Sequence, residues 1–260
     1  MYQSENDAMK KSILVILASF LIFSCEKTED DSNLVCTQDC SEITGKVYTH
    51  SGIPLKNILM KFKFSKNGSN NVRQTRIISK VKTNSLGEYA MNFYLNEEEL
   101  GEWIGDFSLY ADKNTVPGNL FYQDYFNLFD TMYTITNRDF SVTRNLYIPT
   151  PKKVKIRLNN FNGPEQEDYF RVLAEVPCGF DYDDSINPET GNNHKYATLG
   201  LNKYMLTNYN NLTSKTFEVD LALNERNYIL VGKMKNGVYT QERISIDVTE
   251  NSNQILEFNY

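Results

Sequence analysis

Carboxylates gather in one polar stretch of the chain, between Gly179 and Asn193. A calcium ion takes six to eight hard oxygen ligands, and closely spaced aspartates can supply them. The EF-hand template fails, because Ile186 stands where that loop needs glycine and Asn192 where it needs a bidentate glutamate. The alternative is a solvated, turn-rich loop. The candidate calcium ligands are Asp181, Asp183, Asp184 and Glu189.

Motifs of enzymes are missing from the sequence. It contains no Gly-x-Ser-x-Gly, no His-Glu-x-x-His and no glycine-rich phosphate loop. His50 and His194 fall in predicted loops, and neither has a partner nearby in the sequence. We therefore expect a non-catalytic protein without a cofactor. The competing class is a surface hydrolase or a calcium-dependent glycan-binding protein that uses the acidic loop over residues 181–193.

Aromatic side chains crowd the segment from Leu120 to Phe129. Exposed tyrosine and phenylalanine rings can stack on sugars or anchor a partner protein. The alternative is that these rings fold back and cover a core. The candidate ligand-binding residues are Phe121, Tyr122, Tyr125 and Phe126.

Cys25 follows a short apolar run that begins after Lys10-Lys11. The run is too short to span ~30 Å of hydrocarbon comfortably, so it reads as the apolar part of a signal peptide. Ser24 directly before Cys25 resembles the lipobox of bacterial lipoproteins, which predicts acylation of Cys25. Acids precede the lysines, so we expect translation to start at Met9. The alternative is a cytoplasmic tail before a membrane helix.

The acidic stretch over residues 26–31 follows the cysteine directly. It resembles the signal that sends lipoproteins of Bacteroidota to the outer face of the outer membrane. This resemblance implies an acyl-anchored protein that faces the cell exterior, with membrane lipid as one partner. We expect a binding, adhesion or structural accessory module that holds an unidentified protein or glycan near the cell surface. The alternative is a plain solvated tether, because short acidic stretches stay disordered.

Three further cysteines are Cys36, Cys40 and Cys178. An exported chain permits disulfides, and Cys36 and Cys40 could close a small loop. Cys178 is then left over, and we expect it to be free and buried. The two histidines show no zinc-ligand spacing.

Composition favours an all-β protein that does not bind nucleic acid. The net charge is −6, which is unsuited to phosphate backbones. Tyrosine, phenylalanine and β-branched residues recur in short alternating runs, as is typical of strands. The best helix candidate is short, over residues 96–104, with Asn96 as its N-cap.

Three successive sequence elements combine glycines, turn residues and alternating apolar residues. They contain Ile43, Gly45 and Val47; then Gly52, Pro54, Leu55, Asn57 and Ile58; then Thr83, Asn84, Gly87, Glu88 and Tyr89. Together they resemble the carboxypeptidase regulatory-like domain, whose members are transthyretin-like β-sandwiches. Asn84 replaces the commoner aspartate but retains its turn chemistry. These residues shape turns and a core, so the resemblance implies a fold and no activity.

We expect two tandem antiparallel β-sandwiches after the signal. Residues 1–24 are the predicted signal peptide and 25–40 a tether. The first sandwich spans 41–149 and the second 150–260, because Pro149 and Pro151 interrupt strand pairing there. Gly87 is expected at positive φ in a turn, with Tyr89, Met91 and Phe93 entering the first core. Lys235-Asn236-Gly237 predicts a hairpin.

Overall fold

A computed structural model describes residues 27–67, 73–102, 104–120, 131–163, 165–181, 196–207, 212–251 and 255–260. The strands in the first part of the chain are β1 (Lys27–Asp30), β2 (Ser41–Tyr48), β3 (Leu59–Asn67), β4 (Arg73–Lys82), β5 (Glu88–Phe93), β6 (Asp106–Ala111), β7 (Thr131–Tyr133), β8 (Ser141–Thr143) and β9 (Leu146–Tyr147). Those that follow are β10 (Pro151–Asn159), β11 (Tyr169–Asp181), β12 (Tyr196–Thr207), β13 (Lys215–Ala222), β14 (Arg226–Lys235), β15 (Val238–Asp247) and β16 (Ile255–Asn259). Single turns of 3-10 helix occur at η1 (His50–Gly52), η3 (Glu97–Glu99) and η4 (Lys113–Thr115).

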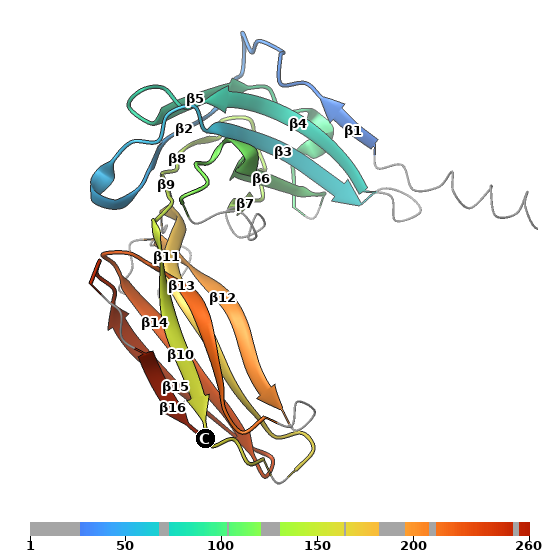
Figure 1. Ribbon diagram of the computed structural model, residues 1–260. Coiled ribbons are helices and arrows are strands. Elements are labelled where there is room, and N and C mark those ends of the chain that lie inside the picture. The colour runs from blue at the N-terminus through green and yellow to red at the C-terminus, as the bar shows by residue number, and fades with distance from the viewer. Residues whose placement is uncertain are drawn as a thin grey trace, which may run out of the picture.

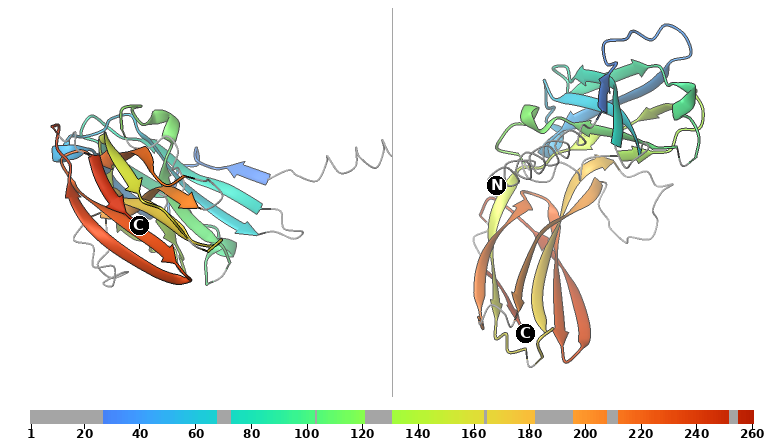
Figure 2. Two further views of the ribbon diagram at one scale, coloured as in Figure 1. Left: turned by 60° about the horizontal axis from the view of Figure 1, so that its bottom comes forward. Right: turned by 90° about the vertical axis from the view of Figure 1, so that its right-hand side faces the viewer.

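The strands form an upper and a lower body, which Figure 1 shows one above the other. In the upper body, a five-stranded sheet has the order β1-β4-β3-β6-β7. In the lower body, a three-stranded sheet has the order β13-β10-β16. The remaining sheet is eight-stranded and follows β15-β14-β11-β9-β2-β5, with β12 on β11 and β8 on β2. Figure 2 shows the strands of the lower body running along its length.

The prediction of an all-β protein is confirmed, and most strand pairs are antiparallel. Parallel pairs are also present, namely β1 with β4, β2 with β8, β2 with β9, and β10 with β16. The two-residue strand β9 pairs with β2 on one side and with β11 on the other. One sheet therefore continues from the upper body into the lower, on both sides of the chain boundary predicted at 149/150.

Aromatic rings fill the core of the upper body, between the five-stranded sheet and the part of the eight-stranded sheet that contains β5. The ring of Phe62 lies 4.8 Å from that of Phe93 and 5.7 Å from that of Phe107, centroid to centroid. Tyr89, Met91 and Phe93 of β5 are all buried, whereas Ala90 and Asn92 are exposed. The predicted register of this strand is confirmed, because alternate side chains of a strand point to opposite faces.

The third sequence element closes the turn between β4 and β5. The Oδ1 atom of Asn84 accepts hydrogen bonds from the backbone N–H groups of Leu86 (2.8 Å) and Glu88 (2.9 Å). Gly87 has φ +73°, and a Cβ there would lie 2.5 Å from the carbonyl oxygen of Val47. The predicted turn is confirmed, and it needs glycine for both reasons.

Gly45 of β2 lets another chain segment pass close by. A Cβ on Gly45 would lie 1.7 Å from the carbonyl oxygen of Arg144. The same oxygen accepts a hydrogen bond from the hydroxyl of Tyr89 at 2.7 Å. Burial raises the pKa of Tyr89, so the phenol keeps the proton that it donates. Glycine and tyrosine of two separate sequence elements thus meet at one backbone carbonyl.

The Asn236-Gly237 hairpin is confirmed, because Lys235 pairs with Val238 and both central residues have positive φ. The helix predicted over 96–104 is wrong, since only Glu97–Glu99 forms a 3-10 turn. There the carboxylate of Glu99 accepts the N–H of Asn96 at 2.9 Å, and Gly101 turns the chain away at φ +127°. Glycine readily adopts a positive φ, but a right-handed helix requires a negative one, so no helix continues through Gly101.

Strand β12 was not predicted from the sequence pattern. It pairs with β11, and the register shifts between Val172 and Ala174. Tyr204 stands opposite Val172, whereas Leu201 stands opposite Ala174, so β12 carries one extra residue there. Such a bulge breaks the two-residue alternation by which a strand is recognised in a sequence.

We expect Phe93→Ala to lower the free energy of unfolding by roughly 3–5 kcal/mol, because it removes buried ring contacts and leaves a cavity. Asn92→Ala, the exposed neighbour, should change it by no more than about 0.5 kcal/mol. Urea unfolding of the mature chain measures both. Equal stability of the two variants would contradict the observed register.

Candidate functional site

Most of the candidate residues lie outside the described part of the chain. These are Cys25, the aromatic group Phe121, Tyr122, Tyr125 and Phe126, and the acids Asp183, Asp184 and Glu189. His194 also lies outside it. Acylation, ring stacking and calcium binding at these residues stay predictions.

Asp181, the one described member of the acidic loop, lies where the two bodies meet. Its Oδ1 atom accepts a hydrogen bond from the hydroxyl of Tyr48 at 3.3 Å, and its Oδ2 atom one from the Nδ2 of Asn145 at 2.7 Å. Its backbone N–H also donates to the carbonyl of Asn145 at 2.9 Å. The carboxylate of Asp181 is thus occupied in joining β11 to the chain around β2 and β9. A calcium ion would have to compete with these donors.

A second polar pair crosses the same junction. The hydroxyl of Tyr147 donates to the Oε1 atom of Glu225 at 2.6 Å, and the Nδ1 atom of His50 lies 3.7 Å from that oxygen. The rings of Tyr48 and Tyr147 pack with centroids 5.6 Å apart. Residues from three separate parts of the sequence therefore hold the upper body to the turn between β13 and β14.

Cys36 and Cys40 form a disulfide with a Cα–Cα distance of 5.8 Å. Two exposed apolar side chains, those of Leu34 and Val35, directly precede the loop that this disulfide closes. Cys178 is free and buried, as expected, and burial raises the pKa of its thiol. A thiol held neutral in this way is a packing residue and a poor nucleophile.

Part of the segment predicted as a tether is folded. Residues 27–30 form β1, which pairs in parallel with β4 at the edge of the five-stranded sheet. The carboxylate of Asp30 forms an ion pair with Lys80 and accepts the hydroxyl of Ser32 at 2.6 Å. The hydrogen bond from Lys80, followed by that from Ser32, lowers the pKa of Asp30 to about 2. The tether interpretation is wrong for these residues, because β4 supplies both a free strand edge and a cation.

Arg76 of β4 is the buried centre of this edge. It forms an ion pair with buried Glu99, with Nε to Oε1 at 2.6 Å. A second ion pair joins it to Asp31, just after β1, at 3.3 Å. Burial favours the neutral guanidinium, but the hydrogen bonds and charges of Glu99 and Asp31 outweigh it and raise the pKa of Arg76. One cation thus fastens the acidic segment and the η3 turn to the same strand.

The sequence carries one signal for the role of Arg76, although no motif includes this residue. Arg76 and Ile78 share the inward face of β4, where an alternating strand normally has apolar residues. A charge at an inward position needs a buried partner of opposite sign. The sequence could not identify that partner, because Glu99 is brought close only by the turn at η3.

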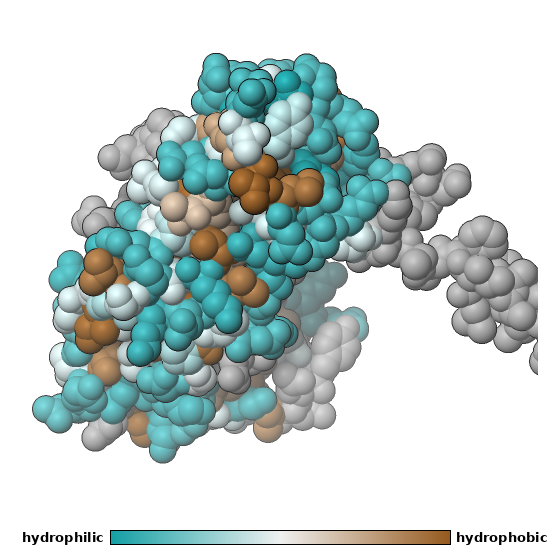
Figure 3. Space-filling model, turned by 90° about the horizontal axis from the view of Figure 1, so that it is seen from above, coloured by the Kyte–Doolittle hydropathy of each residue, from teal (hydrophilic) through white to brown (hydrophobic). Residues whose placement is uncertain are grey.

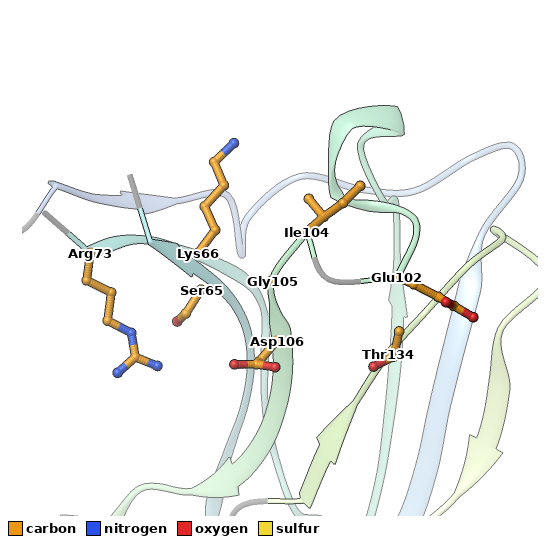
Figure 4. A pocket seen from close by; sticks show the side chains of 8 residues that line it. All are labelled: Ser65, Lys66, Arg73, Glu102, Ile104, Gly105, Asp106 and Thr134. Atoms are coloured by element: carbon orange, nitrogen blue, oxygen red, sulfur yellow. The ribbon is translucent and has the colours of Figure 1, made fainter. Parts of the chain in front are cut away.

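A polar pocket of about 740 Å³ opens beside the end of β3 and the start of β6. Lys66, Arg73, Glu102 and Asp106 supply charges of both signs, and Ser65 and Thr134 supply hydroxyls. Figure 4 shows the guanidinium of Arg73 and the carboxylate of Asp106 on one side of the strand ends, whereas Lys66 extends to the other. Ile104 adds one apolar side chain to the lining, and the mixture of charges suits a polar ligand.

Metal ligands do not cluster in the described ranges, where no three His, Cys, Asp or Glu residues converge. Within those ranges no helix is long and apolar enough to cross a membrane. Seen from above, the surface is mainly hydrophilic with scattered apolar residues (Figure 3).

No family model matches the chain, and no curated protein matches its sequence. The chain is distantly similar to solved structures, several of them pilins. The Bacillus anthracis TIE protein has 10% identity and a TM-score of 0.26, covering 85% of this chain and 33% of that one. A streptococcal ancillary pilin has 11% identity and a TM-score of 0.29, covering 86% and 63%. A double mutant of the shaft pilin SpaA from Lactobacillus rhamnosus GG has 6% identity and a TM-score of 0.29, covering 85% and 96%. The chain thus spans a third of the first protein and less than two thirds of the second, and likeness at this level supports no inference about function.

We expect Glu99→Ala to lower the free energy of unfolding by roughly 3–5 kcal/mol, because it leaves Arg76 buried without its main counter-ion. The exposed neighbour Glu98 is the matched control, and Glu98→Ala should cost no more than about 0.5 kcal/mol. Urea unfolding of both variants provides the comparison. A Glu99→Ala variant as stable as the control would show that Arg76 does not depend on this ion pair.

Lys80→Met should raise the pKa of Asp30 from about 2 toward its ordinary 3.8. Because folding depresses this pKa, the pairing contributes stability above about pH 4 and loses it as the pH falls through about 2. The carboxyl carbon shift of Asp30, followed by NMR against pH, measures the change. Lys61→Met, which removes a similar ion pair with Asp112, should leave the Asp30 titration unaltered. An unchanged pKa in Lys80→Met would contradict the pairing.

Proposed function

We propose that the chain is a non-catalytic lipoprotein of the cell surface, anchored through acylated Cys25. In this role it displays its β-sandwich bodies as a binding, adhesion or structural accessory module. Its partners are the lipid of the outer membrane and a protein or glycan outside the cell. The lipobox at Ser24-Cys25 and the acidic stretch behind it support the address.

The proposed role rests on one observation: paired strands form a continuous connection from the chain next to the predicted anchor to the lower body. Strand β1 starts two residues after Cys25 and is hydrogen-bonded along β4. The upper body is joined to the lower through β9, which pairs with both β2 and β11. Asp181 and Glu225 add side-chain hydrogen bonds across the same junction. A pull on the lower body is therefore carried to the anchor through paired strands, as an adhesion or structural module requires.

Two carboxylates of the described regions, those of Asp181 and Glu99, support a structural use. The carboxylate of Asp181 is held by Tyr48 and Asn145, and that of Glu99 by Arg76. A catalytic acid or base needs a free path to a substrate proton, and these carboxylates face partners within the fold. This arrangement favours a binding or structural module over a hydrolase.

Cys25→Ala should abolish acylation and release the protein from membranes, or leave an uncleaved precursor. Incorporation of an alkyne-labelled fatty acid, together with membrane fractionation, measures the effect. Cys178→Ala is the matched control, because that thiol is buried and should not be acylated. Unchanged labelling and fractionation of Cys25→Ala would overturn the proposed anchor.

Surface display is tested separately by protease treatment of intact cells that make the unaltered protein. We expect cleavage without permeabilising the outer membrane. Cleavage only after permeabilisation would place the protein on the periplasmic side and overturn the proposed display.

A further inference from the structure

Two lysines face the interior of the lower body at its far end. Lys233 and Lys235 are two residues apart on β14, so their side chains lie on the same face of the strand. This is the inward face, because Lys233 stands opposite the fully buried Phe170 of β11. Lys235 lies beside Tyr260, and Figure 1 marks that end of the chain with C, away from the upper body. The two lysines are therefore far from the body to which the proposed anchor is attached.

The ammonium groups of these lysines lie over aromatic rings and not beside acids. The Nζ atom of Lys233 is 5.6 Å from the ring centroid of Phe170, and that of Lys235 is 5.0 Å from the ring centroid of Tyr260. Such contacts hold a cation in place without neutralising it. Among the described residues neither lysine forms an ion pair, whereas the inward Arg76 forms two. Both ammonium groups are therefore available to an anion from outside the fold.

A hollow of about 330 Å³ opens beside the two lysines. The described residues that line it are Lys233, Lys235, Asn236, Val238, Thr240 and Tyr260. No acid is among them, and Glu242, the next inward residue of β15 after Thr240, does not line the hollow. The lining thus combines two cations, two neutral hydrogen-bonding groups and apolar surface. Ligand pockets range over roughly 300–1,000 Å³, so this hollow suits a unit the size of one sugar ring.

Tyr260 gives the hollow a fixed wall. Its hydroxyl donates to the carbonyl of Met234 at 2.5 Å, and its ring packs against that of Phe161 with centroids 4.9 Å apart. Burial, followed by the charge of Asp168, raises the pKa of Tyr260 to about 12, so the phenol is neutral at ordinary pH. Asp168 is itself buried, and its Oδ2 atom accepts the N–H of Glu165 at 3.1 Å. This acid does not line the hollow, whose own charges are both positive.

We infer that this hollow binds an acidic sugar residue of a glycan outside the cell. Lys233 and Lys235 bind the carboxylate or sulfate group of that sugar. Asn236 and Thr240 form hydrogen bonds with its hydroxyls, and Tyr260 contacts its C–H groups. A neutral sugar leaves both ammonium groups without a counter-charge, and an acidic peptide side chain leaves the amide and the hydroxyl without partners. The inference deepens the proposed binding role by naming the chemistry of the partner, and it rests on that role.

The test is an NMR titration of the isotope-labelled mature chain, which carries Cys25→Ala so that it stays in solution. The probes are a trimer of galacturonate and a sulfated trimer of galactose, which distinguish a carboxylate from a sulfate as the charged group. We expect at least one of them to shift the backbone amide signals of residues 233–240 and 260. The uncharged trimer of galactose and a trimer of glutamate should bind at least about tenfold more weakly, because each lacks one set of the contacts.

Variants of the lysines test the site itself. Lys233→Gln with Lys235→Gln should weaken binding of the acidic trimer at least about tenfold, because both charged hydrogen bonds are lost. Lys153→Gln with Lys155→Gln is the matched control, since it removes two exposed lysines of the same spacing from β10. It should leave the affinity unchanged. Urea unfolding shows whether each variant is folded, and Thr240→Glu, an exposed change that adds an acid to the hollow, replaces the glutamine pair if that pair does not fold.

The outcomes separate this inference from the proposed anchor. Equally tight binding of the glutamate trimer would replace the glycan by an acidic protein segment, and equally tight binding of the galactose trimer would show that the lysines are not used. Either result overturns the inference, as do amide shifts confined to other residues, an unaltered affinity in the glutamine variant, or binding of neither acidic trimer. Because the titrated protein carries no acyl group, all of these results leave the proposed anchor standing. A failure of acylation at Cys25, in turn, leaves the sugar site unaffected.

Discussion

Backbone pairing through the short strand β9 is the constraint on which the arrangement of this protein depends. Leu146 and Tyr147 bond in parallel to β2 and in antiparallel fashion to β11. Because backbone donors and acceptors must find partners when buried, these two residues can be satisfied only if both bodies are in place. The side-chain contacts of Tyr48, Asn145 and Asp181 follow from that pairing, since β9 brings their strands together.

Backbone pairing also determines the structure of the sheet edge formed by β1 and β4. Strand β4 would be an open sheet edge without β1, and open edges invite pairing with other chains. Asp30 and Asp31 place their carboxylates beside Lys80 and Arg76, so the acidic residues both cover the edge and neutralise its cations. A stretch of sequence that resembles an export signal thereby also has a structural role.

The motif residues of the upper body illustrate how a sequence pattern encodes a fold without encoding an activity. Thr83 accepts the N–H of Ile58 at 2.9 Å and donates to the carbonyl of Leu55 at 2.6 Å. Asn84 and Gly87 shape the next turn, and Gly45 admits the carbonyl of Arg144. Each requirement is local and steric, which is why the pattern is readable from one sequence. A ligand-binding role carries no comparable local requirement.

By itself the sequence determined the all-β class, the register of β5, the Gly87 and Asn236-Gly237 turns and the buried state of Cys178. These features depend on the alternation of apolar and polar residues, on residue types that tolerate a positive φ and on the burial of small apolar groups. Residues that are close together in the sequence determine all three. Tertiary structure alone decided the strand at residues 27–30, the bulged strand β12, the partner of Arg76 and the use of Asp181 at the junction. Each of these depends on residues that are far apart in the chain, such as Asp181 and Tyr48, 133 positions apart. Such pairs leave no periodic trace in a single sequence, because their spacing is set by the path of the chain between them.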